Sequence, residues 1–134
     1  MIEVRDREGH LLYVDKEHDE TFFLCCENVD LRKANFQGWN LWSAFFSNCD
    51  LRGAIFDDAD LSEAHFDFCY LSEASLQNAD MGEAKLECCE IKGADMRGAN
   101  LSSAIVDITM DIELDALIDE GTTLPSHHHH LHFC

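Results

Sequence analysis

The stretch "GADMRGANLSSA", residues 93–104, contains the pattern that decides the fold. Ala94, Ala99 and Ala104 lie five residues apart, and Met96 and Leu101 repeat the same spacing between them. A helix returns a side chain to the same face every 3.6 residues and a strand every 2. A period of five fits neither of these. The chain must therefore adopt another backbone that buries one small and one large apolar residue in every five.

This five-residue pattern runs through most of the chain. Sixteen consecutive central positions are large and apolar, namely Leu31, Phe36, Leu41, Phe46, Leu51, Phe56, Leu61, Phe66, Leu71, Leu76, Met81, Leu86, Ile91, Met96, Leu101 and Val106. The position two residues before each centre is Ala or Cys, except at Val29 and Trp39. The position directly before the centre is often Asp or Asn, as at Asp60 and Asn100. Such a long internal repeat outweighs any local reading of secondary structure.

The motif Ala-(Asp/Asn)-Leu-X-X, seen in "ADLSE" at 59–63 and "ANLSS" at 99–103, resembles the pentapeptide-repeat family. The resemblance covers roughly residues 24–106. It implies an all-β fold, a right-handed quadrilateral parallel β-helix of about four coils with terminal caps, in which each pentapeptide forms one side. Stacking of identical positions is also what a solenoid needs to bury a continuous core. The only proline, Pro125, lies beyond the repeats, where it cannot interrupt hydrogen bonding between coils.

The two ends of a solenoid need covers, and the sequence suggests where they lie. We expect an N-terminal hairpin cap over residues 1–23, turning at Arg7-Glu8-Gly9, before the β-helix of residues 24–106. Trp39 is too large for a column of alanines, so it is expected at the wider bottom of the shaft. Residues 107–126 form a C-terminal cap with a short helix or irregular coil, and residues 127–134 form a histidine-rich tail.

Composition limits the range of functions. The chain of 134 residues is short enough for one domain, and its net charge of −18 repels nucleic acid and anionic membranes. We therefore expect no direct nucleic-acid partner and no membrane partner. No apolar run is long enough for a membrane span, and the charged N-terminus lacks a signal-peptide core, which predicts a cytoplasmic location. The acidic surface either serves solubility alone or attracts basic proteins.

Two groups of possible metal ligands occur. Cys49, Cys69 and Cys89 lie twenty apart, so they should share one interior column; a line of sulfurs does not suit tetrahedral zinc, and we interpret them as small core residues. The odd cysteine count also disfavours disulfides. The tail offers imidazole ligands at His127, His128, His129, His130 and His132. A histidine run at a chain end also resembles an appended tag or a frayed extension, so we assign no metal and no cofactor.

No catalytic constellation is present in the sequence. The carboxylates fall on an outer solvent face without an expected cleft, and no Ser or Thr occurs in a recognisable motif with a histidine. There is no glycine-rich phosphate loop, because Gly53, Gly93 and Gly98 take the corner positions of repeats. We therefore expect a protein that is not an enzyme.

The register predicts one unusual outer surface. Trp42, Phe45, Phe68 and Tyr70 should all project outward, and soluble monomers rarely expose such aromatic groups without use. The alternative is that the caps fold over them. We expect an interaction scaffold that binds a protein partner or a second copy of itself. The other candidate is an acidic DNA mimic that acts on DNA gyrase or another DNA-binding protein. It comes from the family resemblance, since some members resemble duplex DNA and occupy the DNA site of DNA gyrase.

Overall fold

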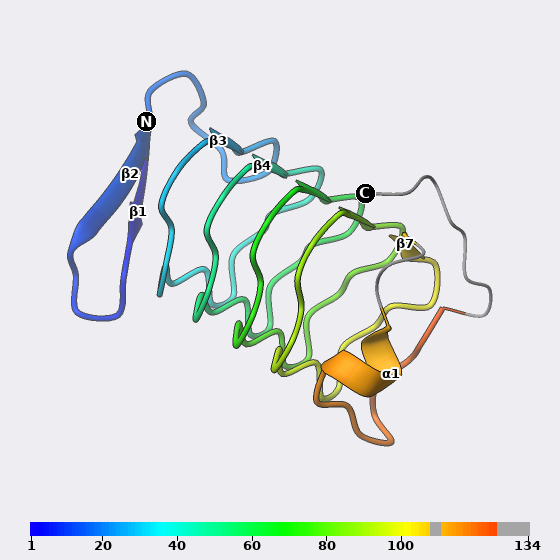
Figure 1. The fold of residues 1–134 in the computed structure, drawn as a ribbon. Coiled ribbons are helices and arrows are strands. Elements are labelled where there is room, and N and C mark those ends of the chain that lie inside the picture. Colours follow the sequence, from blue (N-terminus) through cyan, green and yellow to red (C-terminus); the bar gives the residue numbers. More distant parts are fainter. Residues whose placement is uncertain (108–110, 126–134) are drawn as a thin grey trace.

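The computed structural model describes residues 1–107 and 111–125, which form a four-sided parallel β-helix with a hairpin at one end and a short helix at the other (Figure 1). Five short strands stack in register along one side: β3 (Cys25–Glu27), β4 (Phe45–Ser47), β5 (His65–Asp67), β6 (Lys85–Glu87) and β7 (Ile105–Val106). Each pairs in parallel with the strand twenty residues later, as Phe46 does with Phe66. The predicted fold class is confirmed, and the helix is right-handed.

We number the sides by the central residues that point into the shaft. Face 1 is the strand face, with centres Cys26, Phe46, Phe66, Leu86 and Val106. Face 2 has Leu31, Leu51, Leu71 and Ile91; face 3 has Phe36, Phe56, Leu76 and Met96; face 4 has Leu41, Leu61, Met81 and Leu101. All sixteen predicted centres are buried. The sequence pattern therefore maps onto the shaft without a break in register.

The corners between sides explain the period of five. On faces 2, 3 and 4 the backbone N–H three residues after a centre donates to the carbonyl of that centre, as from Ala34 to Leu31 at 3.0 Å. The residue two after the centre, which we call the corner residue, has positive φ at every one of these corners except Ser103, for example 63° at Lys33 and 71° at Gly53. This is the conformation of a type II turn, which favours glycine or asparagine at that position. Each turn bends the chain into the next side.

The frequent Asp or Asn before each centre has a local function. Its side-chain oxygen accepts a hydrogen bond from the backbone N–H two residues later, as Asp60 does from Ser62 at 2.9 Å and Asn100 from Ser102 at 3.1 Å. Asp and Asn side chains commonly satisfy a nearby backbone donor in this way. The bond occurs on faces 2, 3 and 4, whereas face 1 uses strand pairing and has none of these residues before its centres.

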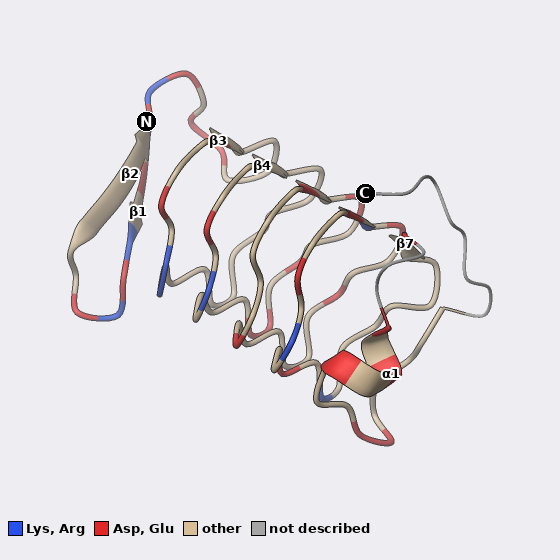
Figure 2. Ribbon diagram, in the orientation of Figure 1, with Lys and Arg blue, Asp and Glu red and all other residues tan. Residues whose placement is uncertain are grey.

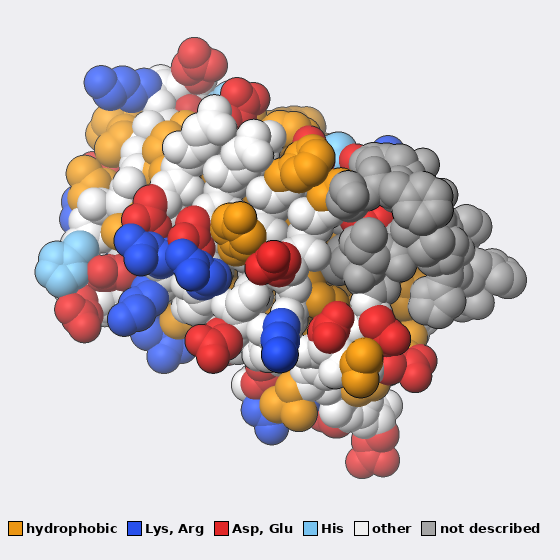
Figure 3. All heavy atoms as spheres, in the orientation of Figure 1, with side chains coloured by type: hydrophobic (Ala, Val, Ile, Leu, Met, Phe, Trp, Pro, Cys, Tyr) orange, Lys and Arg blue, Asp and Glu red, His pale blue; other side chains and the backbone are white. Residues whose placement is uncertain are grey.

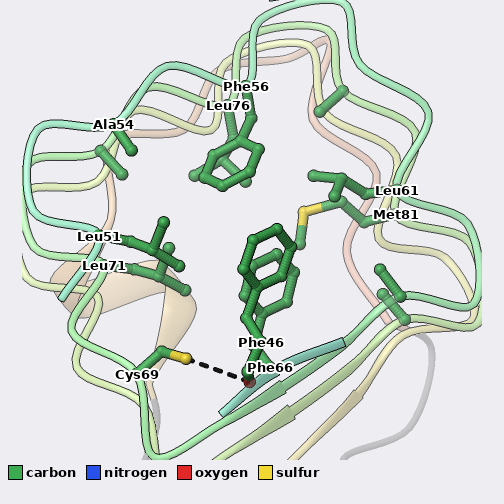
Figure 4. Packing of buried hydrophobic residues seen from close by; sticks show 14 of the residues in the cluster. Phe46, Leu51, Ala54, Phe56, Leu61, Phe66, Cys69, Leu71, Leu76 and Met81 are labelled. Atoms are coloured by element: carbon green, nitrogen blue, oxygen red, sulfur yellow. Dashed lines mark hydrogen bonds between the residues drawn. The ribbon is translucent and has the colours of Figure 1, made fainter. Parts of the chain in front are cut away.

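Phenylalanine rings fill the N-terminal half of the shaft. Phe46 stacks on Phe66 with centroids 5.0 Å apart, and Phe36 stacks on Phe56 from the opposite side at the same distance. The two stacks meet edge to face, with Phe56 and Phe66 centroids 5.8 Å apart (Figure 4). Offset and edge-to-face pairs each add about 0.5–1.5 kcal/mol beyond the area they bury. The remaining shaft volume is filled by Leu, Ile, Met and Val centres and by the small residues.

The predicted interior cysteine column is confirmed. Cys49, Cys69 and Cys89 are buried, and each thiol lies within hydrogen-bonding distance of a carbonyl in the coil below, as Cys69 Sγ does at 3.3 Å from Phe46 O (Figure 4). These thiols are free, and burial raises the pKa of neighbouring Cys26 well above its ordinary value. The expectation that disulfides are absent is wrong at Cys88, which is disulfide-bonded.

We expect the three thiols of this column not to react with thiol reagents in the native protein. A maleimide should label half-buried Cys25 within minutes and leave Cys49, Cys69 and Cys89 unlabelled, because only the exposed thiolate reacts quickly. All of them should react once denaturant is added, and mass spectrometry of peptides would locate the labels. Rapid labelling of the column in the folded protein would show that these residues do not point inward.

Both ends of the shaft are covered. At the N-terminal end, β1 (Ile2–Arg5) and β2 (Leu11–Asp15) form an antiparallel hairpin, and Asn35 N–H donates to Arg5 O at 2.8 Å. Ile2 and Val4 are buried beneath the first coil. Trp39 is partly buried, and its ring meets Phe36 edge to face at 5.2 Å. The column that contains Ala59 therefore holds an indole only at its N-terminal end, at Trp39, where the shaft is open.

At the C-terminal end the chain leaves the repeat and then returns to it. The helix α1 (Ile112–Asp115) is N-capped by Asp111, whose side chain accepts a hydrogen bond from Leu114 N–H. Leu117 then pairs with Asp95, and Thr123 pairs with Asn100, so these residues add part of a further coil over faces 3 and 4. Among the described residues, no helix has the length and apolar character needed to cross a membrane.

Candidate protein-binding surface

Face 2 carries four basic residues, and its two arginines are paired with aspartates. Arg32 contacts Asp30 at 2.7 Å and Arg52 contacts Asp50 at 2.5 Å, and each guanidinium holds the pKa of its aspartate below the ordinary value. In Figure 3 the side facing the viewer shows blue and red side chains close together with orange ones between them. Exposed pairs of this kind contribute about 0–1 kcal/mol each. Face 2 is therefore nearly balanced in charge.

Face 4 has a different electrostatic character. Its four repeats, residues 39–43, 59–63, 79–83 and 99–103, contain no Lys or Arg. Asp60 and Asp80 form one row of carboxylates, and Glu63 and Glu83 form another at the corner toward face 1. A groove of about 720 Å³ lies along that corner, with Glu63, Glu83, Lys85 and Pro125 among its lining residues. The carboxylates of faces 4 and 1 thus meet no Lys or Arg within the face 4 repeats, and helix α1 adds Glu113 and Asp115 at the C-terminal end of the shaft (Figure 2).

The four aromatic residues predicted to face outward do not form one continuous patch. Trp42 is 38% exposed on face 4, where its ring meets Phe23 at 5.2 Å and Phe23 meets Phe22 at 5.3 Å. Phe45 on face 1 is only partly exposed, and its ring meets His65 at 5.2 Å. The sequence pattern missed Phe22 and Phe23, because they precede the first complete coil.

Phe68 and Tyr70 do come together. They are 53% and 50% exposed at the corner between faces 1 and 2, where a groove of about 570 Å³ follows that corner across four coils. We call this the corner groove; it is lined by Asn28, Val29, Asp30, Asn48, Cys49, Asp50, Phe68, Cys69, Tyr70, Cys88 and Glu90. The guanidinium of Arg52 lies 5.8 Å from the centroid of the Tyr70 ring. Writing the sequence in rows of twenty would have revealed these columns.

Both aromatic residues break a local rule of the repeat. Phe68 occupies a corner position and has φ of 53°, a left-handed conformation that is unusual for a bulky residue. Tyr70 stands where Asp30 and Asp50 accept hydrogen bonds from the backbone N–H groups of the arginines two residues later. Both side chains are about half exposed, so burial does not offset the free energy lost through the left-handed backbone at Phe68 and the missing side-chain hydrogen bond at Tyr70. Positions where a sequence departs from its own local rules tend to be functional.

The described residues contain no group of three or more His, Cys, Asp or Glu that could hold a metal ion. His65 Nε2 lies 3.2 Å from Glu87 Oε1 on face 1. The histidines proposed as weak metal ligands, at 127–130 and 132, lie outside the described residues.

The stacked coils of four five-residue sides place this protein in the class of β-helical solenoid repeat proteins. The sequence matches the profile "Pentapeptide repeats" in eight copies over residues 30–67 and 64–102. The chain therefore belongs to the pentapeptide-repeat family, as the repeat motif predicted. A search of curated protein sequences finds no significant match.

Several solved structures share the fold. A pentapeptide repeat protein from Nostoc PCC 7120, alr5209, is 23% identical, with a TM-score of 0.61 over 75% of this chain and 80% of that one. The fluoroquinolone resistance protein QnrB1 is 24% identical, with a TM-score of 0.57 over 80% of this chain and 62% of that one. HetL from Nostoc, involved in heterocyst differentiation regulation, is 23% identical with a TM-score of 0.50, over 79% and 53%. The chain thus spans less than two thirds of QnrB1 and HetL, and these similarities define the fold alone.

The strained corner residue makes a specific prediction about stability. Phe68→Gly should leave the free energy of unfolding unchanged or raise it by up to about 1 kcal/mol, because glycine adopts positive φ without a steric penalty. Asn48→Gly in the same column is the matched control, since asparagine already tolerates this conformation. Urea unfolding of both variants measures the effect. A loss above 1 kcal/mol in Phe68→Gly would mean that the ring is needed for folding.

Proposed function

We propose that this protein is a non-enzymatic binding protein that docks a partner protein on the corner groove. The observation that carries the proposal is the pair Phe68 and Tyr70, two half-exposed aromatic residues that break the repeat pattern in the same coil. In the two preceding coils the same columns hold Asn28 and Asn48, and Asp30 and Asp50, which suit a left-handed corner and a backbone hydrogen bond better than aromatic rings do. We therefore assign the two rings to binding rather than to the fold.

Interface energetics support the same choice of surface. Aromatic residues dominate binding energy because they bury a large area with few rotatable bonds, whereas charges at an interface rim mainly affect association rate and salt dependence. The acidic rows of face 4 would then steer a basic partner toward the protein, and the corner groove would hold it. This division of roles predicts different outcomes for aromatic and acidic variants.

The experiment compares three variants in quantitative capture of partners from native extract and in sedimentation. Phe68→Ser with Tyr70→Ser should lose a captured protein or lose self-association. Trp42→Ser, an aromatic change on face 4, and the neutralised face 4 variant Asp60→Asn, Glu63→Gln, Asp80→Asn, Glu83→Gln should keep it. Binding that survives the loss of Phe68 and Tyr70 but disappears with the carboxylates would overturn the proposal.

The second candidate is imitation of DNA, and face 4 is the observation that favours it. Asp60, Glu63, Asp80 and Glu83 form two rows of carboxylates on face 4, whose repeats contain no Lys or Arg, so this side is negatively charged, as a nucleic acid is. Four coils at the strand spacing are about 19 Å long, which matches only about six base pairs of DNA. A supercoiling assay with purified DNA gyrase tests this candidate directly. Inhibition that is abolished by neutralising face 4 would support it over docking at the corner groove.

A further inference from the structure

We infer that the corner groove binds an extended segment of a partner protein that carries a lysine or arginine next to an apolar residue. This inference rests on the proposed function and specifies the chemistry of the partner at the same site. It is argued from the shape of the groove, its polar groups and its charge.

The shape of the groove favours an extended chain over a helix. One wall is the corner column Asn28, Asn48, Phe68 and Cys88, and the other is the column Asp30, Asp50, Tyr70 and Glu90. The walls are two residues apart along the chain, so their Cα atoms are at most about 7 Å apart. A helix with its side chains is about 10–12 Å wide and does not fit between them. Three coil steps cover about 14 Å, the length of about four residues of extended chain.

The groove also offers groups that suit a peptide backbone. The side-chain amides of Asn28 and Asn48 each have donors and an acceptor, and neither makes a hydrogen bond to another described residue. They lie one coil apart, about 4.8 Å along the axis, so both can reach the same extended segment. Beyond them the rings of Phe68 and Tyr70 face the groove from its two walls, and an apolar side chain between them would be buried.

The charge around the rings favours a cation. Arg52 is an example of a cation held by a carboxylate and an aromatic ring. Its guanidinium contacts the Asp50 carboxylate and lies 5.8 Å from the centroid of the Tyr70 ring. Phe68 and Tyr70 share one coil, and Glu90 follows Tyr70 in the next coil, where it has no ion pair with any described residue. A partner cation beside Glu90 would form a second ion pair next to the Tyr70 ring. Cations over aromatic faces gain about 0.5–2 kcal/mol, depending on desolvation.

The test is selection of a displayed random heptapeptide library on the full-length protein, followed by fluorescence anisotropy with a labelled synthetic peptide from the enriched set. We expect enrichment of Lys or Arg beside an apolar residue. Phe68→Ser with Tyr70→Ser should weaken binding of that peptide at least tenfold, and Glu90→Gln should weaken it several-fold. Trp42→Ser, the matched aromatic control, should leave its affinity unchanged.

The outcomes separate this inference from the proposed function. If a charge-inverted peptide with Glu in place of Lys or Arg binds equally well, the inferred partner chemistry is wrong. If the enriched peptides ignore the groove variants while capture of a folded partner still depends on Phe68 and Tyr70, the extended-segment inference fails and the proposed function stands. If neither peptide binding nor capture depends on these rings, both are overturned.

Discussion

Ala79→Trp is expected to abolish cooperative folding. Ala79 is 1% exposed and stacks in a column between Ala59 and Ala99, and the coils above and below are hydrogen-bonded at fixed spacing. Close-packed interiors accept extra volume only by displacing backbone, and even a few added methylenes cost about 1–3 kcal/mol. An indole in this column should cost more than about 3 kcal/mol, a large part of the stability of a small domain. Circular dichroism during thermal unfolding measures the loss.

The control for this prediction lies in the same column. Trp39 is the residue twenty positions before Ala59, and it is only partly buried at the open end of the shaft. Trp39→Ala should therefore remain folded and lose about 1–3 kcal/mol, less than for a fully buried tryptophan. An Ala79→Trp variant that melts within a degree or two of the wild type would contradict the inward direction of this column.

Phe66→Ala is expected to cost about 3–5 kcal/mol, the range for removing a fully buried phenylalanine. Its ring is 0% exposed, stacks on Phe46 at 5.0 Å and meets Phe56 edge to face at 5.8 Å. The coils are held in register by hydrogen bonds, so they cannot collapse into the space that the ring leaves. Urea denaturation, with the free energy of unfolding extrapolated to water, measures the effect.

Phe68→Ala is the matched control, because the same side chain is removed two residues away. Phe68 points outward and is 53% exposed, so the free energy of unfolding should change by less than about 0.5 kcal/mol. Equal losses at the two positions would mean that inward and outward directions are not separated as described. Together the pair tests whether the fold needs one ring and leaves the other available for binding.

The division between inward and outward residues could be predicted from the sequence because a solenoid makes the same contacts in every coil. Once Ala94, Ala99 and Ala104 are seen to repeat, adding twenty to a residue number identifies its neighbour in the next coil, and Phe46 above Cys26 follows at once. The binding surface could be predicted only in part. The outward direction of Phe68 and Tyr70 follows from register, but whether two outward residues touch depends on the angle at each corner.

The sequence alone determined the β-helix, its register and its interior column of cysteines, because those depend on periodicity, and periodicity is visible in one dimension. Only the tertiary structure decided which aromatic residues share a surface. Trp42 turns toward Phe23 on face 4, while Phe68 and Tyr70 flank one groove at the opposite side of the strand face. The physical reason is that a positive φ at the corner residue rotates its side chain relative to both neighbouring sides, and such a rotation is a property of the folded backbone.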